Sequence, residues 1–158
     1  MVTMEEQGPK LSDVDISALE ARLGVALPLS YRQFLLVFNG GVPTPDNVDV
    51  EGLEGGAADV QVFFGVGRAI EATCIEWNTA TLTERLDSWL VPIASDSGGS
   101  VFCLSVRRED HGSVLYCDLT SVFGDLGIRP PLYFVARDFE AFVAKLRPFT
   151  EDTAAKPR

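Results

Sequence analysis

The order of the hydrophobic periodicities is the feature that most constrains the fold of this chain. Near both ends, apolar residues recur every three or four positions, which is typical of amphipathic helices. The middle instead contains short apolar runs that are separated by turns rich in Gly and Asp. Strands grouped between terminal helices favour an α+β fold, with a single, mostly antiparallel twisted sheet and helices packed against it.

Two helices are predicted before the sheet and one after it. The first spans Leu11 to Gly24, where Ser12 and Asp15 resemble a capping box. The second begins at Pro28, because a proline tolerates the first turn of a helix, and it carries Tyr31 on its apolar stripe. It ends at residues that adopt left-handed backbone angles at little cost, which are Asn39, Gly40 and Gly41. The last helix follows its capping residue, Asp138.

The strands are expected to form an antiparallel meander. The predicted strands cover residues 48–50, 60–66, 90–94, 100–106, 113–117 and 132–135. The turn between the third and fourth of these is formed by Asp96, Ser97, Gly98 and Gly99. Residues 68–86 are ambiguous: Ile70, Cys74 and Trp77 fit one face of a helix that breaks or ends near Asn78.

The chain is expected to form one domain. Its 158 residues suit a single unit, which we place at residues 12–148. Residues 1–11 are then an N-terminal tail, and residues 149–158 a flexible C-terminal tail. The start of the chain is polar, and no apolar run approaches the ~20 residues that a bilayer span needs.

The charge balance restricts the partners. With 13 Lys and Arg against 23 Asp and Glu, the formal charge is −10. This argues against binding to nucleic acid, whose affinity comes largely from cationic contacts, and against an anionic membrane surface. It favours a basic protein partner, because a negative surface potential accelerates and orients such an encounter.

No catalytic, metal or cofactor constellation is recognisable. The one histidine, His111, lies in a charged turn, where nothing would hold the imidazole beside a nucleophile. A calcium loop is superficially suggested by Asp46, Asn47, Asp49 and Glu51, but this run lacks the ordered alternation of ligands, the central Gly and the distal Glu. The three cysteines, Cys74, Cys103 and Cys117, are widely spaced and odd in number, which predicts reduced thiols in a cytoplasmic protein. Two glycine patches, at residues 54–56 and 65–67, are interpreted as turns.

One stretch concentrates the negative charge. No Lys or Arg lies between Arg32 and Arg68. Five acidic residues fall in this interval: Asp46, Asp49, Glu51, Glu54 and Asp59. The stretch fits a solubilising loop, and it equally fits a recognition surface whose carboxylates pair with Lys or Arg of a partner.

Four blocks of this sequence resemble the SUKH superfamily, which includes the yeast cell-wall assembly regulator and many bacterial immunity proteins. The blocks are residues 27–41, with Pro28, Tyr31 and the Asn39-Gly40-Gly41 run; 91–105, with Asp96, Gly98 and Gly99; 112–118; and 136–142. They occur in the family's order. Ser100 departs from the pattern, since the family often has Asn there, and residues 42–88 and 120–131 align poorly.

The resemblance implies an α+β fold, no enzymatic activity and, in bacteria, direct binding to a polymorphic toxin that is often a nuclease or a deaminase. The leading hypothesis is therefore an immunity protein that neutralises a basic toxin, with the five acidic residues as its partner-binding set. A general protein-interaction or regulatory module of the same fold is the second hypothesis. A hydrolase that uses two carboxylates is the third. The sequence identifies neither the toxin nor the oligomeric state.

Overall fold

The computed structural model describes residues 1–122 and 128–150. Residues 123–127 of the predicted loop, and residues 151–158 of the expected C-terminal tail, lie outside the described residues. The helices are α1 (Asp13–Leu23), α2 (Leu29–Val37), α3 (Ile75–Thr81) and α4 (Phe139–Ala144), with 3-10 turns η1 (Glu71–Thr73), η2 (Arg108–Asp110) and η3 (Thr120–Val122). The strands are β1 (Thr3–Glu5), β2 (Val42–Thr44), β3 (Asn47–Asp49), β4 (Ala57–Asp59), β5 (Val62–Phe63), β6 (Leu90–Ser95), β7 (Val101–Ser105), β8 (Val114–Cys117) and β9 (Leu132–Ala136).

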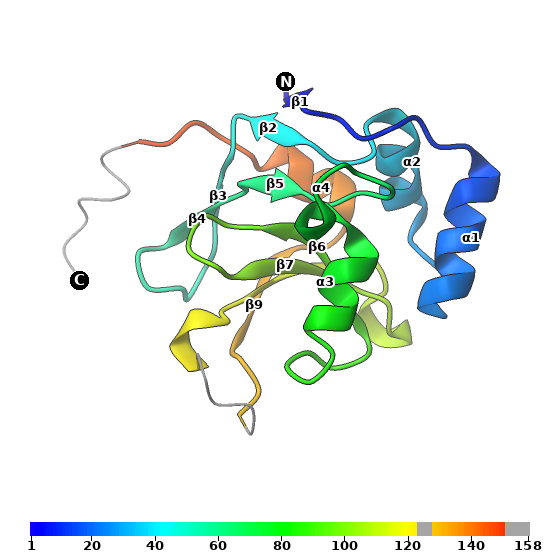
Figure 1. The fold of residues 1–158 in the computed structure, drawn as a ribbon. Helices are drawn as coiled ribbons and strands as arrows, with labels where there is room; N and C mark the ends of the chain where they lie inside the picture. The colour runs from blue at the N-terminus through cyan, green and yellow to red at the C-terminus, as the bar shows by residue number, and fades with distance from the viewer. Residues whose placement is uncertain (123–127, 151–158) are drawn as a thin grey trace.

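The main sheet has five antiparallel strands in sequence order, β5-β6-β7-β8-β9 (Figure 1). This confirms the α+β class and the predicted antiparallel meander. Two additional two-stranded ribbons, β1-β2 and β3-β4, flank the sheet and were not expected. The β1-β2 pairing joins residues far apart in the sequence, so local hydrophobic patterns do not reveal it, whereas β3 and β4 are joined by the short loop of residues 50–56.

An aromatic cluster joins α2 and α4 to the sheet. Phe34 of α2 lies 5.0 Å from Phe63 of β5 and 4.7 Å from Phe139 of α4, measured between ring centroids. Phe142 of α4 lies 5.1 Å from Phe102 of β7. Tyr31 is fully buried beside Phe139. Such tilted and edge-to-face ring pairs contribute about 1 kcal/mol each beyond the burial of their area, so this cluster forms the centre of the core.

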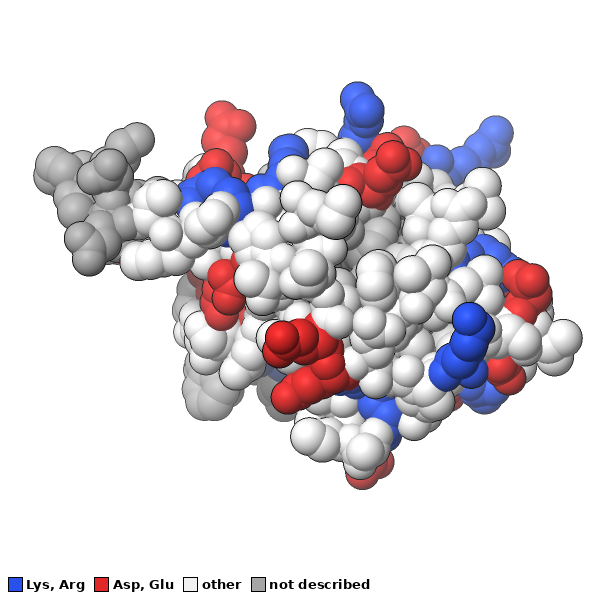
Figure 2. Space-filling view, turned by 90° about the horizontal axis from the view of Figure 1, so that it is seen from above, with Lys and Arg blue, Asp and Glu red and all other residues white. Residues whose placement is uncertain are grey.

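The outer side of the same helices is largely uncharged. A groove of ≈ 550 Å³ lies between α2, α4 and the first residues of the chain, and Glu140 is the one charged side chain among the described residues that line it. Val37 of α2 is 66% exposed there. Figure 2 views the molecule from above and shows a broad uncharged area with acidic and basic side chains scattered around it. This side offers no concentration of one charge.

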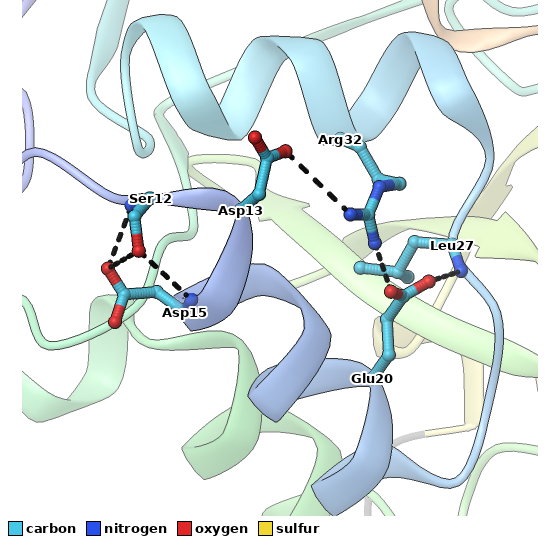
Figure 3. A network of polar contacts seen from close by, with 6 residues as sticks. All are labelled: Ser12, Asp13, Asp15, Glu20, Leu27 and Arg32. Carbon is cyan, nitrogen blue, oxygen red and sulfur yellow. Dashed lines mark hydrogen bonds and ion pairs between the residues drawn. The ribbon is translucent and has the colours of Figure 1, made fainter.

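A polar clamp holds α1 against α2 (Figure 3). Arg32 of α2 forms an ion pair with Glu20 of α1 and lies 4.0 Å from the carboxylate of Asp13. The second carboxylate oxygen of Glu20 accepts a hydrogen bond from the backbone N–H of Leu27 at 2.7 Å. Glu20 therefore links α1 to both the connecting loop and the next helix.

The predicted start of α1 is confirmed. The Ser12 hydroxyl accepts the backbone N–H of Asp15, and the Asp15 carboxylate accepts the backbone N–H of Ser12 at 2.8 Å (Figure 3). The hydrogen bonds that the backbone N–H and the hydroxyl of Ser12 donate to the Asp15 carboxylate stabilise its charged form and lower the pKa of Asp15. Gly24 ends the helix with φ of 71°, in the left-handed region that favours glycine.

The expectation of a tail over residues 1–11 is wrong for its first half. Thr3–Glu5 forms β1 and pairs with β2, so that Met4 is opposite Pro43 and is buried. The pairing depends on Gly41, since a Cβ there would approach the Glu5 carbonyl to 2.5 Å. The glycine removes a side chain that would otherwise push the N-terminal segment away.

The helical face predicted within residues 68–86 is also wrong. The helix does end at Thr81, but Ile70 is 68% exposed and Trp77 37% exposed, whereas Ile75 and Asn78 are buried. The Asn78 side chain donates hydrogen bonds to the carbonyls of Ala72 and Cys74, at 3.0 and 2.9 Å. These bonds fix η1 against the start of α3 and rotate the helix away from the predicted orientation.

Asn39 joins three segments at the end of α2. It is buried, with φ of 52°, and its side-chain NH2 donates to the carbonyls of Pro9 and Val66 at 2.8 Å each. Its side-chain oxygen accepts the backbone N–H of Val66 at 2.8 Å. Its own carbonyl accepts from the backbone N–H of Gly8 and from Arg68. The N-terminal segment, α2 and the residues after β5 are thereby held together.

A second polar cluster closes the turn between β7 and β8. Asp110 accepts hydrogen bonds from Arg107 at 2.8 and 3.0 Å and from the Ser105 hydroxyl at 2.6 Å. The Arg107 guanidinium also lies 3.7 Å from the ring centroid of Trp89. The hydrogen bond from Arg107 is the main cause that lowers the pKa of Asp110 from 3.8 to about 2.

We expect Asn39→Ala to lower the free energy of unfolding by about 3 kcal/mol, because three part-buried backbone groups of Pro9 and Val66 lose their hydrogen-bond partner. Urea denaturation followed by circular dichroism measures the change. Gln33→Ala, at an exposed position on α2, is the control and is expected to stay within about 0.5 kcal/mol of wild type. Equal stability of the two variants would contradict the role assigned to Asn39.

Asp110→Asn is expected to change how stability depends on acid pH. Because the folded-state pKa of Asp110 lies below its unfolded value, the carboxylate stabilises the fold fully above pH 3.8 and loses this contribution as the pH falls through about 2. The stability difference between wild type and variant is therefore largest near neutral pH and shrinks between about pH 4 and pH 2. Urea titrations at a series of pH values test this, and a constant difference would refute it.

Candidate partner-binding groove

The acidic stretch folds into the β3-β4 ribbon and the loop between its strands. Val48 and Val50 on the β3 side are completely buried, and so is Val60 just after β4. The connecting loop contains glycines in the left-handed region, among them Gly55 and Gly56, with φ of 87° and 75°. The apolar residues therefore anchor the ribbon to the core while the loop carries its carboxylates at the surface.

A groove of ≈ 910 Å³ opens between this ribbon and the end of the main sheet. Its charged lining is entirely acidic among the described residues and consists of Asp46, Glu54, Asp59, Asp96 and Asp118. Leu53, Tyr116 and Phe149 add apolar surface. Three predicted partner-binding residues, Asp46, Glu54 and Asp59, thus share one groove.

The groove acids of the ribbon are positioned by nearby hydrogen bonds. Asp59 accepts from the backbone N–H and the hydroxyl of Ser97, at 3.1 and 2.9 Å. Asp46 accepts from the Asn47 side chain at 2.8 Å, and its backbone carbonyl accepts from Val60. The contacts of Asp59 attach the ribbon to the β6-β7 turn, so both walls of the groove form one unit.

The other two predicted residues lie outside this lining. Asp49 forms an ion pair with Arg147 at 2.6 Å, and the backbones of Asn47 and Arg147 exchange two hydrogen bonds. Asp49 therefore ties the ribbon to the segment after α4. Glu51 is exposed at the start of the loop, on no wall of the groove. The five residues of the acidic stretch do not form one set.

Asp96 has a structural position at the floor of the groove. One carboxylate oxygen accepts the backbone N–H groups of Gly98 and Ser100, at 3.0 and 2.7 Å, and the other accepts the hydroxyl of Tyr116 at 2.5 Å. Burial, together with this bond to Asp96, raises the pKa of Tyr116. Gly99 completes the turn with φ of 98°. One oxygen of Asp96 thus holds the β6-β7 turn, and the other connects this turn to Tyr116 of β8.

Sequence reasoning missed Asp118 as a groove residue. It directly follows β8, and its carboxylate accepts hydrogen bonds from the Thr120 hydroxyl and the backbone N–H of Ser121. Its position after a strand was visible in the sequence. Its proximity to the β3-β4 ribbon was not, because that depends on how two distant segments pack.

The remaining candidate groups lie elsewhere. His111 is exposed, and its Nε2 lies 2.9 Å from the carbonyl of Ala26. Cys103 and Cys117 are buried, and burial raises the pKa of both thiols, that of Cys117 to about 12. Within residues 1–122 and 128–150, no group of three His, Cys, Asp or Glu side chains has a metal-binding arrangement. No helix in this part of the chain is long and apolar enough to cross a membrane.

The fold and the groove define an α+β domain that presents an acidic recess beside an antiparallel sheet. A sequence profile of the SMI1 / KNR4 family (SUKH-1) matches residues 10–145, and the chain belongs to this family. It is also similar to the SPbeta prophage-derived uncharacterized protein YokK of Bacillus subtilis (strain 168). The two are 27% identical over 145 residues, which cover 83% of this chain and 72% of that protein. The resemblance seen in the sequence blocks is confirmed.

Asp96→Ala is expected to destabilise the protein by about 3 kcal/mol, because two backbone N–H groups and the Tyr116 hydroxyl lose their acceptor. Glu51→Ala, at an exposed position in the loop after β3, is expected to change stability by less than about 0.5 kcal/mol. Chemical denaturation measures both values. A stable Asp96→Ala variant would show that the hairpin does not depend on this carboxylate.

Proposed function

We propose that this protein is an immunity protein that binds a basic toxin domain in its acidic groove and blocks it by occlusion. The observation that supports this proposal best is the charge of the groove. Every charged side chain among its described lining residues is acidic. The SUKH family, to which the chain belongs, includes toxin-immunity proteins. We infer binding rather than catalysis as the activity of this chain.

The groove suits Lys and Arg side chains of a partner. Asp46, Glu54 and Asp59 supply carboxylates along one wall, and an Arg can donate two parallel hydrogen bonds to such a group. Tyr116 and Phe149 supply aromatic surface in the same groove, and guanidinium groups pack favourably against aromatic rings. Nuclease toxins bind phosphates through cationic side chains, so an acidic groove can compete for the same surface.

The net charge of −10 supports the same proposal at longer range. An excess of negative charge attracts a basic domain before contact and accelerates association. The attraction weakens with salt, because the Debye length is only about 8 Å at physiological ionic strength. The carboxylates of the groove then determine where the partner docks.

Removing the charge of the groove is expected to slow the association. In the triple variant Asp46→Asn, Glu54→Gln, Asp59→Asn, the rate constant for binding a basic toxin domain encoded beside the gene should fall about tenfold at low salt. The dependence of this rate on salt should become less steep. Stopped-flow or surface plasmon resonance measurements at several salt concentrations give both quantities.

A matched variant separates the groove from the overall charge. Glu51→Gln, Glu84→Gln, Glu109→Gln removes the same three charges from exposed positions outside the groove. We expect it to retain most of the association rate. Equal loss in both triple variants would refute the groove as the docking site. Failure of the wild-type protein to bind or neutralise any such toxin would refute the immunity function itself.

A further inference from the structure

The outer edge of β9 is an unpaired sheet edge. In the described part of the chain, β9 pairs with β8 on one side and with no strand on the other. Leu132 and Phe134 alternate along it, and Phe134 is 59% exposed. An exposed edge of this kind is a template for an additional strand, which would bond to its free backbone groups.

A groove runs beside this edge. It has a volume of ≈ 630 Å³ and lies between Phe134 and the outward residues of α4, including the small side chains Ala141 and Ala144. The groove shares no residue with the acidic groove. The Nζ of Lys145 donates a hydrogen bond to the carbonyl of Val135 at 2.6 Å. Lys145 therefore protects the end of the edge, while no strand among the described residues pairs with the outer edge of Leu132–Phe134.

The charges around β9 differ from those of the rest of the chain. Three cations, Arg129, Arg137 and Lys145, flank the strand together with two anions, Asp138 and Glu140. A basic partner gains no net electrostatic attraction from these nearly balanced charges. A second copy of this chain, which carries a charge of −10, is repelled by acidic surfaces but not by this edge.

We propose that β9 pairs with β9 of a second copy across a two-fold axis, which joins the two main sheets into one. Antiparallel pairing about the middle of the strand makes the same surface complementary to itself. It also places residues near position 130 of one copy opposite residues near position 138 of the other. Arg129 of each copy then approaches Asp138 of its mate, and Phe134 becomes buried at the centre of the interface.

The oligomeric state of the full chain tests this proposal. Analytical ultracentrifugation over a range of protein concentrations should show a dimer that dissociates on dilution. Phe134→Lys places like charges opposite one another in the centre of the interface and is expected to weaken the dimer about tenfold or more. Val37→Lys, at an exposed position on α2, is the control and should leave the dimer unchanged. Circular dichroism verifies that both variants are folded.

Hydrogen exchange locates the interface. Peptides that contain β9 should exchange more slowly as the protein concentration rises, and this protection should disappear in Phe134→Lys. Three results would overturn the proposal: a monomer up to about 1 mM, a dimer that Phe134→Lys leaves intact, or a monomer whose β9 is protected only when a toxin is added. Toxin binding by the acidic-groove variants is independent of these readouts, so the two proposals fail separately.

Discussion

The fold depends on the buried amide of Asn39. A side-chain amide that donates twice and accepts once can satisfy backbone groups from separate segments, and here it binds Pro9 on one side and Val66 on the other. Neighbouring glycines make this approach possible, because a Cβ at Gly40 would lie 2.7 Å from the Phe63 carbonyl. A buried polar group that is fully hydrogen-bonded specifies one arrangement, since any other leaves it unsatisfied.

The arrangement that Asn39 fixes also sets the position of the acidic groove, because β5 and β6 connect the two regions. Gln61, which precedes β5, donates its backbone N–H to the carbonyl of Ser95 at 2.8 Å, and Asp59 bonds to Ser97 in the turn that follows. Asp96 then holds the same turn from within. The ribbon and the hairpin are thus connected by backbone and side-chain bonds, and the spacing of the groove carboxylates is set by the sheet rather than by a free loop.

The sequence was sufficient where structure is determined locally. The capping box at Ser12, the end of α2 at Asn39 and the turn at Asp96 depend on residues within a few positions, and each was predicted. Contacts between residues far apart in the sequence could not be predicted from the sequence. Thr3–Glu5 becomes a strand only because residues 42–44 lie beside it, and Asp49 leaves the partner-binding set only because Arg147 reaches it. The sequence therefore located the acidic stretch. It could not show which of its carboxylates form bonds within the fold and which line the groove at the surface.

That division also explains how one acidic chain can carry two different surfaces. Carboxylates such as Asp49 and Asp110 are neutralised by arginines of the same chain, and they contribute to the fold. The described lining of the groove contains no cation, and under the proposed function its carboxylates attract a basic partner. At β9 the charges of both signs are mixed, so backbone pairing and the exposed Phe134 decide the contact there. Since the two surfaces share no residue, the proposed dimer through β9 would leave both acidic grooves open to the proposed partner.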